Sequence, residues 1–438
     1  MRRFILSICL FFIVVAASAQ LITASTGGIP CTPVSGSGVD YVFMFKDIRT
    51  AEITYNGTYV DQSSITWTPF TNDNSPNKVN PFSPEGDTGY RLTVDGNKIA
   101  DIWVIDYKAP TLSSIVEASS QPKECKSVDL KIESDVSELT YQNYDGKQFK
   151  IPRNFELKYN TLSWSGTAWA PKDTTITISS PIASQKSVPA PYCSTKFTLS
   201  GDQFAEGLNL TKASVSSIST YTPVAVICHE TSVVSTRNAT NEADRPTTAK
   251  QISGSAPLDM IFYSNPNDPI VKNYNWEIFK DKSKTSIIGG RTDPTTPYTF
   301  TESGSYVVKV TVSNDKACSF SDSVTVTVST SSIVAPNVFT PNGDGFNDEF
   351  RVAYKSITSF HCWIYNRWGR LVYEWTDPMK GWDGNIGGKK AAPGAYFYII
   401  KALGSDYDPN SKADSKTKLR VGEYKLKGDI NLLRGADN

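Results

Sequence analysis

Short stretches of apolar–polar alternation constrain the fold of this chain more than any other feature. In the stretch 360–365, every second residue (Phe360, Cys362 and Ile364) belongs to one face, and residues 424–432 alternate in a similar way. A repeat of two is that of a β-strand, whose successive side chains point to opposite faces. Asn-Gly, Asp-Gly and Pro-Gly pairs end several of these stretches and indicate tight turns. The pattern predicts an all-β protein.

The alternating stretches fall into groups that predict a string of Ig-like β-sandwich domains after a signal peptide. At 438 residues the chain has room for several domains of ordinary size. Long helical patterns rich in Leu, Ala, Glu and Lys are missing from the sequence. We expect a signal peptide at 1–19, β-sandwich modules at 20–110 and 111–220, an Ig-fold domain at 221–330, and a C-terminal domain at 331–438.

The N-terminus has the three parts of a secretory signal peptide. Arg2 and Arg3 form the charged part, residues 4–15 form the apolar part, and the small residues 17–19 fit a cleavage site. The apolar run is too short to span a bilayer. We therefore expect an exported protein, located at the cell surface in association with the outer membrane or in the extracellular space.

The last hundred residues carry several spaced motifs rich in turn formers and aromatic residues. Their residues are Pro336, Asn337, Phe339, Thr340, Pro341, Asn342, Gly343, Asp344, Gly345, Asn347, Asp348, Tyr365, Asn366, Arg367, Trp368, Gly369, Trp382, Asp383, Gly384, Pro393, Gly394, Tyr396, Tyr398, Gly428, Leu432, Leu433 and Arg434. In this order, the motifs resemble the gliding motility-associated C-terminal domain, a type B sorting signal of the type IX secretion system. The resemblance implies an Ig-like sandwich whose partners are the type IX translocon and its outer-membrane docking protein.

The stretch from 221 to 330 resembles a PKD domain, an Ig-like sandwich found in bacterial surface proteins. Trp276 occupies the place of the buried core tryptophan, and residues 304–312 alternate as a long strand. After Ile278 the sequence departs from the family, because residues 279–282 replace its Gly-Asp-Gly turn. That departure puts the geometry of the turn in doubt, and we still expect a sandwich.

The cysteines predict disulfide bonds in an exported protein. Of the seven cysteines, Cys9 would leave with the signal peptide and six would remain. Their placement in the expected domains favours two bonds, Cys125–Cys193 and Cys228–Cys318, and leaves Cys31 and Cys362 as possible free thiols. A metal site is not expected, because the chain has no Cys-x-x-Cys pair and only two histidines.

The sequence offers little material for catalysis, so we expect no enzyme activity and no cofactor. His229-Glu230 would begin a zinc-protease motif, but Val233 stands where the second histidine is required. His361 and Cys362 are adjacent in an expected strand and would point to opposite faces. An unrecognised enzyme site within residues 20–220 remains an alternative, for example a pair of carboxylates.

The loop 342–348 gathers Asn and Asp side chains on glycines, which is compatible with either of two structures. Clustered oxygens can bind calcium, although the full twelve-residue loop pattern is missing. The other interpretation is a turn whose side chains bond to its own backbone. We favour the second structure.

Several surface features could contact partners. Basic residues that could meet an acidic partner are Arg367, Arg370, Lys389, Lys390, Lys412, Lys416, Lys418 and Arg420, and candidate sugar-binding aromatics are Trp67, Trp103, Trp164 and Trp169. Thr174 and Ser323 lie in short patterns that resemble bacterial O-glycosylation sites. The formal net charge is zero, which does not favour nucleic acid.

Taken together, the sequence predicts a non-enzymatic exported protein that carries a type IX sorting domain. Its other modules would serve adhesion, surface assembly or gliding-type motility, with host or surface glycans or proteins as possible partners. This step is an analogy from fold to function. The alternative is a surface-retained component or regulator of the secretion system itself.

Overall fold

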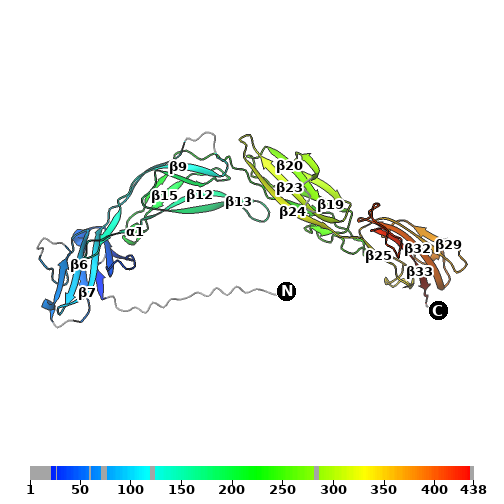
Figure 1. Cartoon of the computed structure of the whole chain (residues 1–438), viewed down its shortest axis with the longest axis horizontal. Helices are drawn as coiled ribbons and strands as arrows, with labels where there is room; N and C mark the ends of the chain where they lie inside the picture. The colour runs from blue at the N-terminus through cyan, green and yellow to red at the C-terminus, as the bar shows by residue number, and fades with distance from the viewer. Residues whose placement is uncertain are drawn as a thin grey trace. The chain divides into compact units, whose positions relative to one another are not determined.

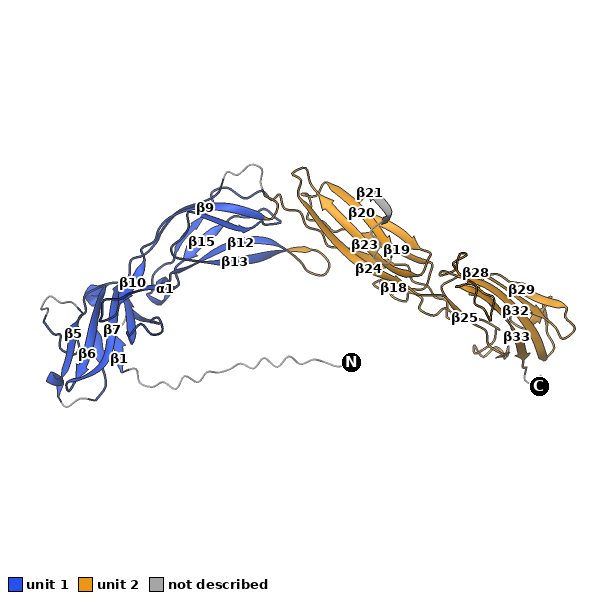
Figure 2. Ribbon diagram, in the orientation of Figure 1, with its two compact units in different colours: residues 1–121, 127–162, 171–222 blue, residues 122–126, 163–170, 223–438 orange. Residues whose placement is uncertain are grey.

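The computed structural model describes residues 21–25, 27–58, 61–70, 76–118, 124–280 and 286–434 (Figure 1). They form two compact units: unit 1 holds the described residues up to 118 together with 127–162 and 171–222, and unit 2 holds 124–126, 163–170 and the described residues from 223 to 434 (Figure 2). Strands dominate both units, so the expected string of Ig-like sandwiches is confirmed. The expected signal peptide lies outside the described residues. Nowhere in the described ranges does a helix have the length and apolar character needed to cross a bilayer.

The first sheet of unit 1 is buried on both faces. Its order is β2 (Gly28–Cys31), β3 (Tyr41–Phe45), β7 (Asn97–Asp106), β6 (Thr88–Val94) and β5 (Ile65–Pro69), with β3 and β7 parallel. Phe43 and Trp67 pack on one face under the small sheet of β1 (Ile22–Ala24) and β4 (Ile53–Tyr55). Val42 and Met44 pack on the other face. Continuous apolar strands such as β3 are typical of this double burial. Short 3-10 helices precede β4 and β5 (η1, Ile48–Thr50; η2, Gln62–Ser64).

The second half of unit 1 is a sandwich of two sheets. One sheet has the order β14 (Gln185–Pro189), β9 (Ser127–Asp135) and β8 (Thr111–Glu117), and the other has β13 (Trp169–Ser179), β12 (Asn154–Trp164), β15 (Thr198–Gly201) and β16 (Ala213–Ser216). Phe155, Leu157 and Leu199 fill the space between them. The stretch 182–192 contains prolines and forms β14, which lies at a sheet edge, where proline is tolerated.

A hairpin of β10 (Leu139–Gln142) and β11 (Gln148–Ile151) and the short helix α1 (Gln203–Gly207) join the two halves of unit 1. Leu139, Tyr141 and Leu208 from the second half share one hydrophobic cluster with Val42 and Met44 from the first. The two expected modules therefore have a common core at the 110/111 boundary.

Unit 2 begins with a sandwich of residues 223–330, the third module. One sheet is β17 (Thr231–Val234), β19 (Leu258–Tyr263) and β22 (Thr295–Phe300), and the other is β18 (Ser253–Gly254), β24 (Ser319–Val328), β23 (Gly304–Ser313), β20 (Asn273–Lys280) and β21 (Ser286–Arg291). Trp276 has no exposed surface and lies in the core, as expected. Strand β20 continues through Lys280, and the rest of the expected turn lies outside the described residues.

The C-terminal domain is a separate sandwich with its own core. Its main sheet has the order β26 (Val338–Phe339), β33 (Glu423–Leu432), β32 (Gly394–Gly404), β28 (Ile357–Tyr365) and β29 (Leu371–Trp375), and its smaller pairs are β25 (Ser332–Val334) with β27 (Ala353–Lys355) and β30 (Asn385–Ile386) with β31 (Lys389–Lys390). Phe360, Cys362 and Ile364 are buried on the inner face of β28, which confirms the predicted alternation.

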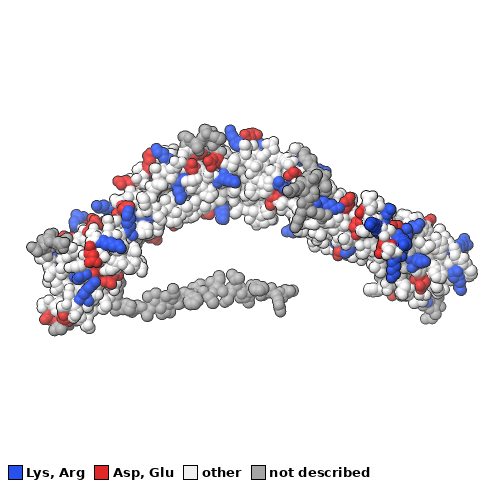
Figure 3. Space-filling view, viewed as in Figure 1, with Lys and Arg blue, Asp and Glu red and all other residues white. Residues whose placement is uncertain are grey.

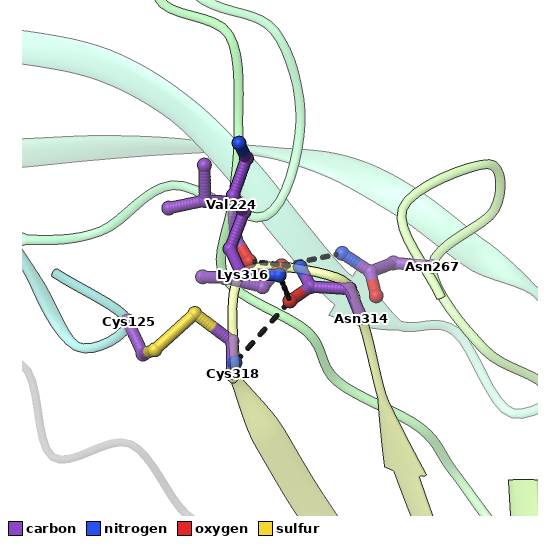
Figure 4. Close-up of a disulfide and its surroundings, with 7 residues drawn as sticks. Cys125, Val224, Asn267, Asn314, Lys316 and Cys318 are labelled. Atoms are coloured by element: carbon purple, nitrogen blue, oxygen red, sulfur yellow. Dashed lines mark hydrogen bonds between the residues drawn. A yellow bond between two sulfur atoms is a disulfide. The ribbon is translucent and has the colours of Figure 1, made fainter. Parts of the chain in front are cut away.

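The disulfide pairing differs from the expected one. Cys125 is bonded to Cys318, with their Cα atoms 5.3 Å apart (Figure 4). Cys31, Cys193, Cys228 and Cys362 are free. Both favoured pairs, Cys125–Cys193 and Cys228–Cys318, are therefore wrong. The reason is that residues 124–126 belong to unit 2, so Cys125 lies beside the turn before β24. Asn314 fixes that turn, because its Oδ1 accepts hydrogen bonds from the backbone N–H groups of Lys316 and Cys318.

Candidate functional site

Arg434 joins three of the C-terminal motifs. Its Nη1 donates to the Pro341 carbonyl at 3.0 Å, and its Nη2 donates to the Gly384 carbonyl at 2.8 Å. Gly384 has a φ of +75°, and a Cβ there would lie 2.9 Å from Nη2. A side chain at position 384 would therefore be strained and would push the guanidinium away. The arginine, the proline loop and the Trp-Asp-Gly turn depend on one another.

Three aromatic motif residues, Phe339, Trp382 and Tyr396, lie in the core of the domain. Trp382 has no exposed surface, and its Nε1 donates to the Asn385 carbonyl at 2.8 Å. Its ring lies 5.3 Å from that of Phe339 and 4.9 Å from that of Tyr396, measured between ring centroids. Buried aromatic pairs of this kind stabilise a core beyond their area. These motif residues therefore hold the fold and do not face a partner.

The loop 342–348 is held by hydrogen bonds to its own backbone. The two carboxylate oxygens of Asp348 accept from the N–H groups of Gly343 at 2.7 Å and Gly345 at 2.8 Å, which holds the pKa of this carboxyl below its usual range. Asp344 accepts from the N–H of Phe346 at 2.8 Å. These bonds agree with the turn that we favoured. Across the described ranges, no group of three or more His, Cys, Asp or Glu residues is placed to hold a metal.

A second set of motif residues lines a groove on the outer face of the main sheet. The groove has a volume of about 570 Å³, and its lining residues are Tyr365, Asn366, Arg367, Gly369, Phe397, Tyr398, Ile399, Lys427, Gly428 and Asp429. They come from β28, the turn after it, β32 and β33, and these three strands are neighbours in the sheet (Figure 2). We call this surface the groove. It brings together motif residues that are far apart in the sequence.

The turn after β28 presents a cation and an indole beside the groove. The Asn366 Oδ1 accepts from the N–H groups of Trp368 at 3.1 Å and Arg370 at 3.0 Å, and Gly369 supplies a φ of +79°. The Trp368 side chain is 78% exposed, and the guanidinium of Arg367 lies 4.8 Å from its ring centroid. An exposed indole beside an arginine is a common feature of protein interfaces.

Two large apolar side chains form the floor of the groove. Phe397 and Ile399 are 46% and 41% exposed, because β32 points its odd-numbered residues away from the core. Phe397 pairs across the sheet with Asp429, and Ile399 pairs with Lys427. Beneath them, a Cβ at Gly428 would lie 2.7 Å from the Tyr398 hydroxyl, so this position needs a glycine for the Tyr398 ring to lie over it. The floor is apolar and its edge is charged.

Residues 333–418 match the CHU_C Type IX secretion signal domain. This match covers most of the C-terminal domain, which we now call the sorting domain. A type IX secretion signal implies export and a location at the cell surface or outside the cell. Residues 117–217 match a fibronectin type III domain, which corresponds to the sandwich of β8–β16. The PKD-like assignment of the third module stays a prediction, and its Ig-like fold is compatible with it.

Solved structures are similar to this chain only at a low level. A tetra-tandem repeat from the extending region of a large adhesion protein is 11% identical, covers 88% of this chain and 96% of that chain, and has a TM-score of 0.23. Dimeric latent PorU from Porphyromonas gingivalis is 12% identical over 78% of this chain and 36% of that chain, with a TM-score of 0.16. E. coli alpha-2-macroglobulin is 10% identical over 89% of this chain and 28% of that chain, with a TM-score of 0.17. No curated protein matches the chain. We base no argument on likenesses this weak.

The groove contains Arg367 but none of the other basic residues expected to meet a partner. Lys389 and Lys390 form β31, and basic and acidic side chains are interspersed on the face in Figure 3. Phe397 and Ile399 were not predicted as site residues. The available signal was two large apolar residues at outward positions of a strand whose inward positions were already apolar.

The other candidate chemistry does not come together. His361 stacks on Trp363 at 3.7 Å and faces outward, while Cys362 has no exposed surface, so the two side chains point to opposite faces as predicted. Trp67 and Trp103 are buried, which rules them out as sugar platforms. Trp164 and Trp169 contact each other edge to face at 5.3 Å, and the Trp169 Nε1 donates to the Asn265 carbonyl at 2.8 Å. The possible glycosylation positions, Thr174 and Ser323, both lie within strands (β13 and β24).

Proposed function

We propose that this chain is a non-enzymatic cell-surface protein, which the type IX translocon and its outer-membrane docking protein recognise through the groove of the sorting domain. The observation that carries the proposal is the division of the motif residues. One set, including Trp382 and Arg434, builds the interior of the domain, whereas the other set gathers at the groove. Arg367, in the second set, is not part of the core cluster, which supports a role in contact with a partner.

The chemistry of the groove fits a protein partner. An apolar floor with Phe397 and Ile399, an exposed aromatic at its edge and a charged rim are what specific protein interfaces contain. The rim carries Arg367 and Lys427 against one carboxylate, Asp429. We therefore expect the partner to offer carboxylates around an apolar side chain.

The test is cell fractionation of the full chain against a truncation that ends at Ser332. The truncated form is expected to stop in the periplasm, while the full chain reaches the surface or the medium. Equal surface display of both forms would refute the sorting role. Circular dichroism of the truncated protein checks that its remaining modules are folded.

The modules of residues 20–330 are the exported part, and we propose that they serve adhesion, surface assembly or gliding-type motility. Support comes from their β-sandwich folds, by analogy from fold to function. Deletion of the gene tests this role: loss of attachment or movement with normal secretion of other cargo supports it. Loss of secretion of other cargo would instead favour a component or regulator of the secretion system.

A further inference from the structure

The third module carries a segment that contacts the sorting domain along much of its length. Residues 237–256, between β17 and β19, contribute the contacts, and we call them the clasp. We propose that the clasp is a docking surface for the sorting domain of the same chain. The sorting domain then stays bound to its neighbour even when the polypeptide between them is cut.

The backbone of the clasp pairs directly with a strand of the sorting domain. The N–H of Tyr354 donates to the Asn241 carbonyl at 3.0 Å, and the N–H of Ala243 donates to the Tyr354 carbonyl at 2.8 Å. Glu242 and Tyr354 thus form a parallel β-bridge. Because β25 pairs with the other side of β27, this strand is hydrogen-bonded on both edges. Main-chain pairing at a strand edge is an established mode of protein recognition.

Side chains add contacts at both ends of this bridge. The Asn241 Nδ2 donates to the carbonyls of Val352 at 2.9 Å and Pro378 at 2.8 Å. Ser356 has no exposed surface, and its Oγ accepts from the N–H of Ala256 at 3.0 Å while donating to the Ser329 carbonyl at 2.7 Å. Buried groups of this kind are costly to leave without partners. If the two domains separated, each of these groups would be exposed or would lose its hydrogen-bond partner.

The clasp is held in shape by a partly buried ion pair of its own. Glu242 is 3% exposed, and its Oε1 and Oε2 accept from Nη2 and Nε of Arg237 at 2.6 and 3.0 Å. The same Nη2 donates to the Ser255 carbonyl at 2.9 Å, near the other end of the clasp. A surface that is ordered before binding loses less entropy when its partner docks. The fold of the clasp therefore does not depend on a continuous chain at residue 330.

The junction between the domains is short and held from both sides. The N–H of Ser329 donates to the Gly254 carbonyl at 2.9 Å, and the Ser331 carbonyl accepts from the Tyr424 hydroxyl at 2.8 Å. Thr330, the one residue between Ser329 and Ser331, is exposed. The hydrophobic clusters of the two domains are separate, so a cut at Thr330 would divide neither core. The inference concerns retention of the sorting domain and holds whether or not the translocon contacts the groove.

The experiment cuts the full chain at this point. A recognition sequence for a site-specific protease is inserted after Thr330, and its effect on folding is checked by thermal unfolding before cleavage. After complete cleavage, size-exclusion chromatography in native buffer is expected to show the C-terminal fragment eluting with the rest of the chain. Elution of that fragment at its own volume, from a protein that was folded before cleavage, would overturn the proposal.

Two further measurements make the result specific. In the cleavable chain, Asn241→Ala combined with Ser356→Ala is expected to raise the dissociation constant of the cut fragments by about tenfold or more, because several buried hydrogen bonds are lost. Asn410→Ala, at an exposed position, is the matched control and should leave the dissociation constant of the cut fragments unchanged. In the uncut chain without the insertion, the amides of Ala243 and Tyr354 should exchange hydrogen as slowly as the amides that are hydrogen-bonded between β25 and β27. Fast exchange at both amides would contradict a stable clasp.

Discussion

Arg153 and Asp202 form an ion pair in which neither side chain has exposed surface, with Nε donating to Oδ2 at 2.6 Å. The remaining guanidinium nitrogens donate to the carbonyls of Ser137 at 3.0 Å and Lys108 at 2.9 Å. The Tyr107 hydroxyl donates to the Asp202 Oδ1 at 2.9 Å. This network ties the segment after β7 to β12 and α1, so it fixes the two halves of unit 1 to each other.

Asp202→Asn is expected to destabilise unit 1 by about 3–5 kcal/mol, because it leaves the Arg153 charge buried without its counter-charge. Scanning calorimetry of the full chain measures the change. The control is Glu138→Gln in the exposed pair with Lys150, which should cost less than about 1 kcal/mol. Equal effects of the two changes would contradict a structural role for the buried pair.

Gly384→Ala is expected to destabilise the sorting domain by about 2–3 kcal/mol. About 1–2 kcal/mol comes from placing an L-residue at positive φ, and the rest comes from displacing Arg434. Gly388→Ala is a matched control, because Gly388 has a φ of +78° but has no atom within 4 Å of an added Cβ. Chemical denaturation of both variants should show a larger loss at position 384, and equal losses would mean that Arg434 does not matter there.

Glu230 should make unit 2 less stable as the pH rises. Burial, and secondarily the charge of Asp322, raises the pKa of this carboxyl from 4.5 to about 7. The folded state therefore holds a proton that the unfolded state has lost, so stability falls as the pH increases from 4.5 to 7, by up to about 3 kcal/mol. Glu230→Gln should flatten this dependence in thermal unfolding between pH 4.5 and 8, whereas Asp315→Asn on an exposed turn should keep it.

The single disulfide among the described residues should be detectable by alkylation. In the denatured, unreduced protein, Cys31, Cys193, Cys228 and Cys362 should be alkylated, while Cys125 and Cys318 should react only after reduction. Cys125→Ser is expected to cost about 2–5 kcal/mol, because the bond restricts the unfolded chain. Cys193→Ser removes a free thiol and should leave the melting temperature unchanged. Peptide mapping that found Cys125 linked to Cys193 would contradict the pairing.

Replacement of groove residues should reduce export without unfolding the sorting domain. Phe397→Ser with Arg367→Glu removes exposed apolar surface and reverses one charge, so surface display should fall by about tenfold or more. Phe346→Ser is the matched control, because Phe346 is 76% exposed but lies outside the groove. Whole-cell immunodetection measures display, and thermal unfolding checks the fold. Loss of display with Phe346→Ser alone would move the contact surface to the loop 342–348.

The strands were predictable from periodicity, because a strand with one buried face has an apolar residue at every second position. The stretch 360–365 shows this, because its inward residues are all apolar whereas its outward residues include the polar His361. Contacts between segments that are distant in the sequence produce no such local pattern. The favoured disulfides were wrong because the fold of unit 2 includes residues 124–126, which only the tertiary structure reveals.

The candidate site was predictable only in part for the same reason. The sequence showed Asn366 and Gly369 as turn formers and Arg434 as a motif residue, but not that Arg434 reaches Gly384. The groove depends on the register of β32 between β28 and β33, which places Phe397 and Ile399 at its floor. The clasp has a polar and irregular sequence, so nothing in its pattern indicated that Asn241 pairs with a strand of another domain.

The hydrophobic cluster that contains Val42, Met44, Tyr141 and Leu208 has a practical consequence for dissecting the exported part. In a fragment that ends near residue 110, the sheet face with Val42 and Met44 would be exposed to water, and an exposed apolar face promotes aggregation. Binding assays on the N-terminal region should therefore use a polypeptide that extends through Thr222. Insolubility of a shorter piece would say nothing about its ligand.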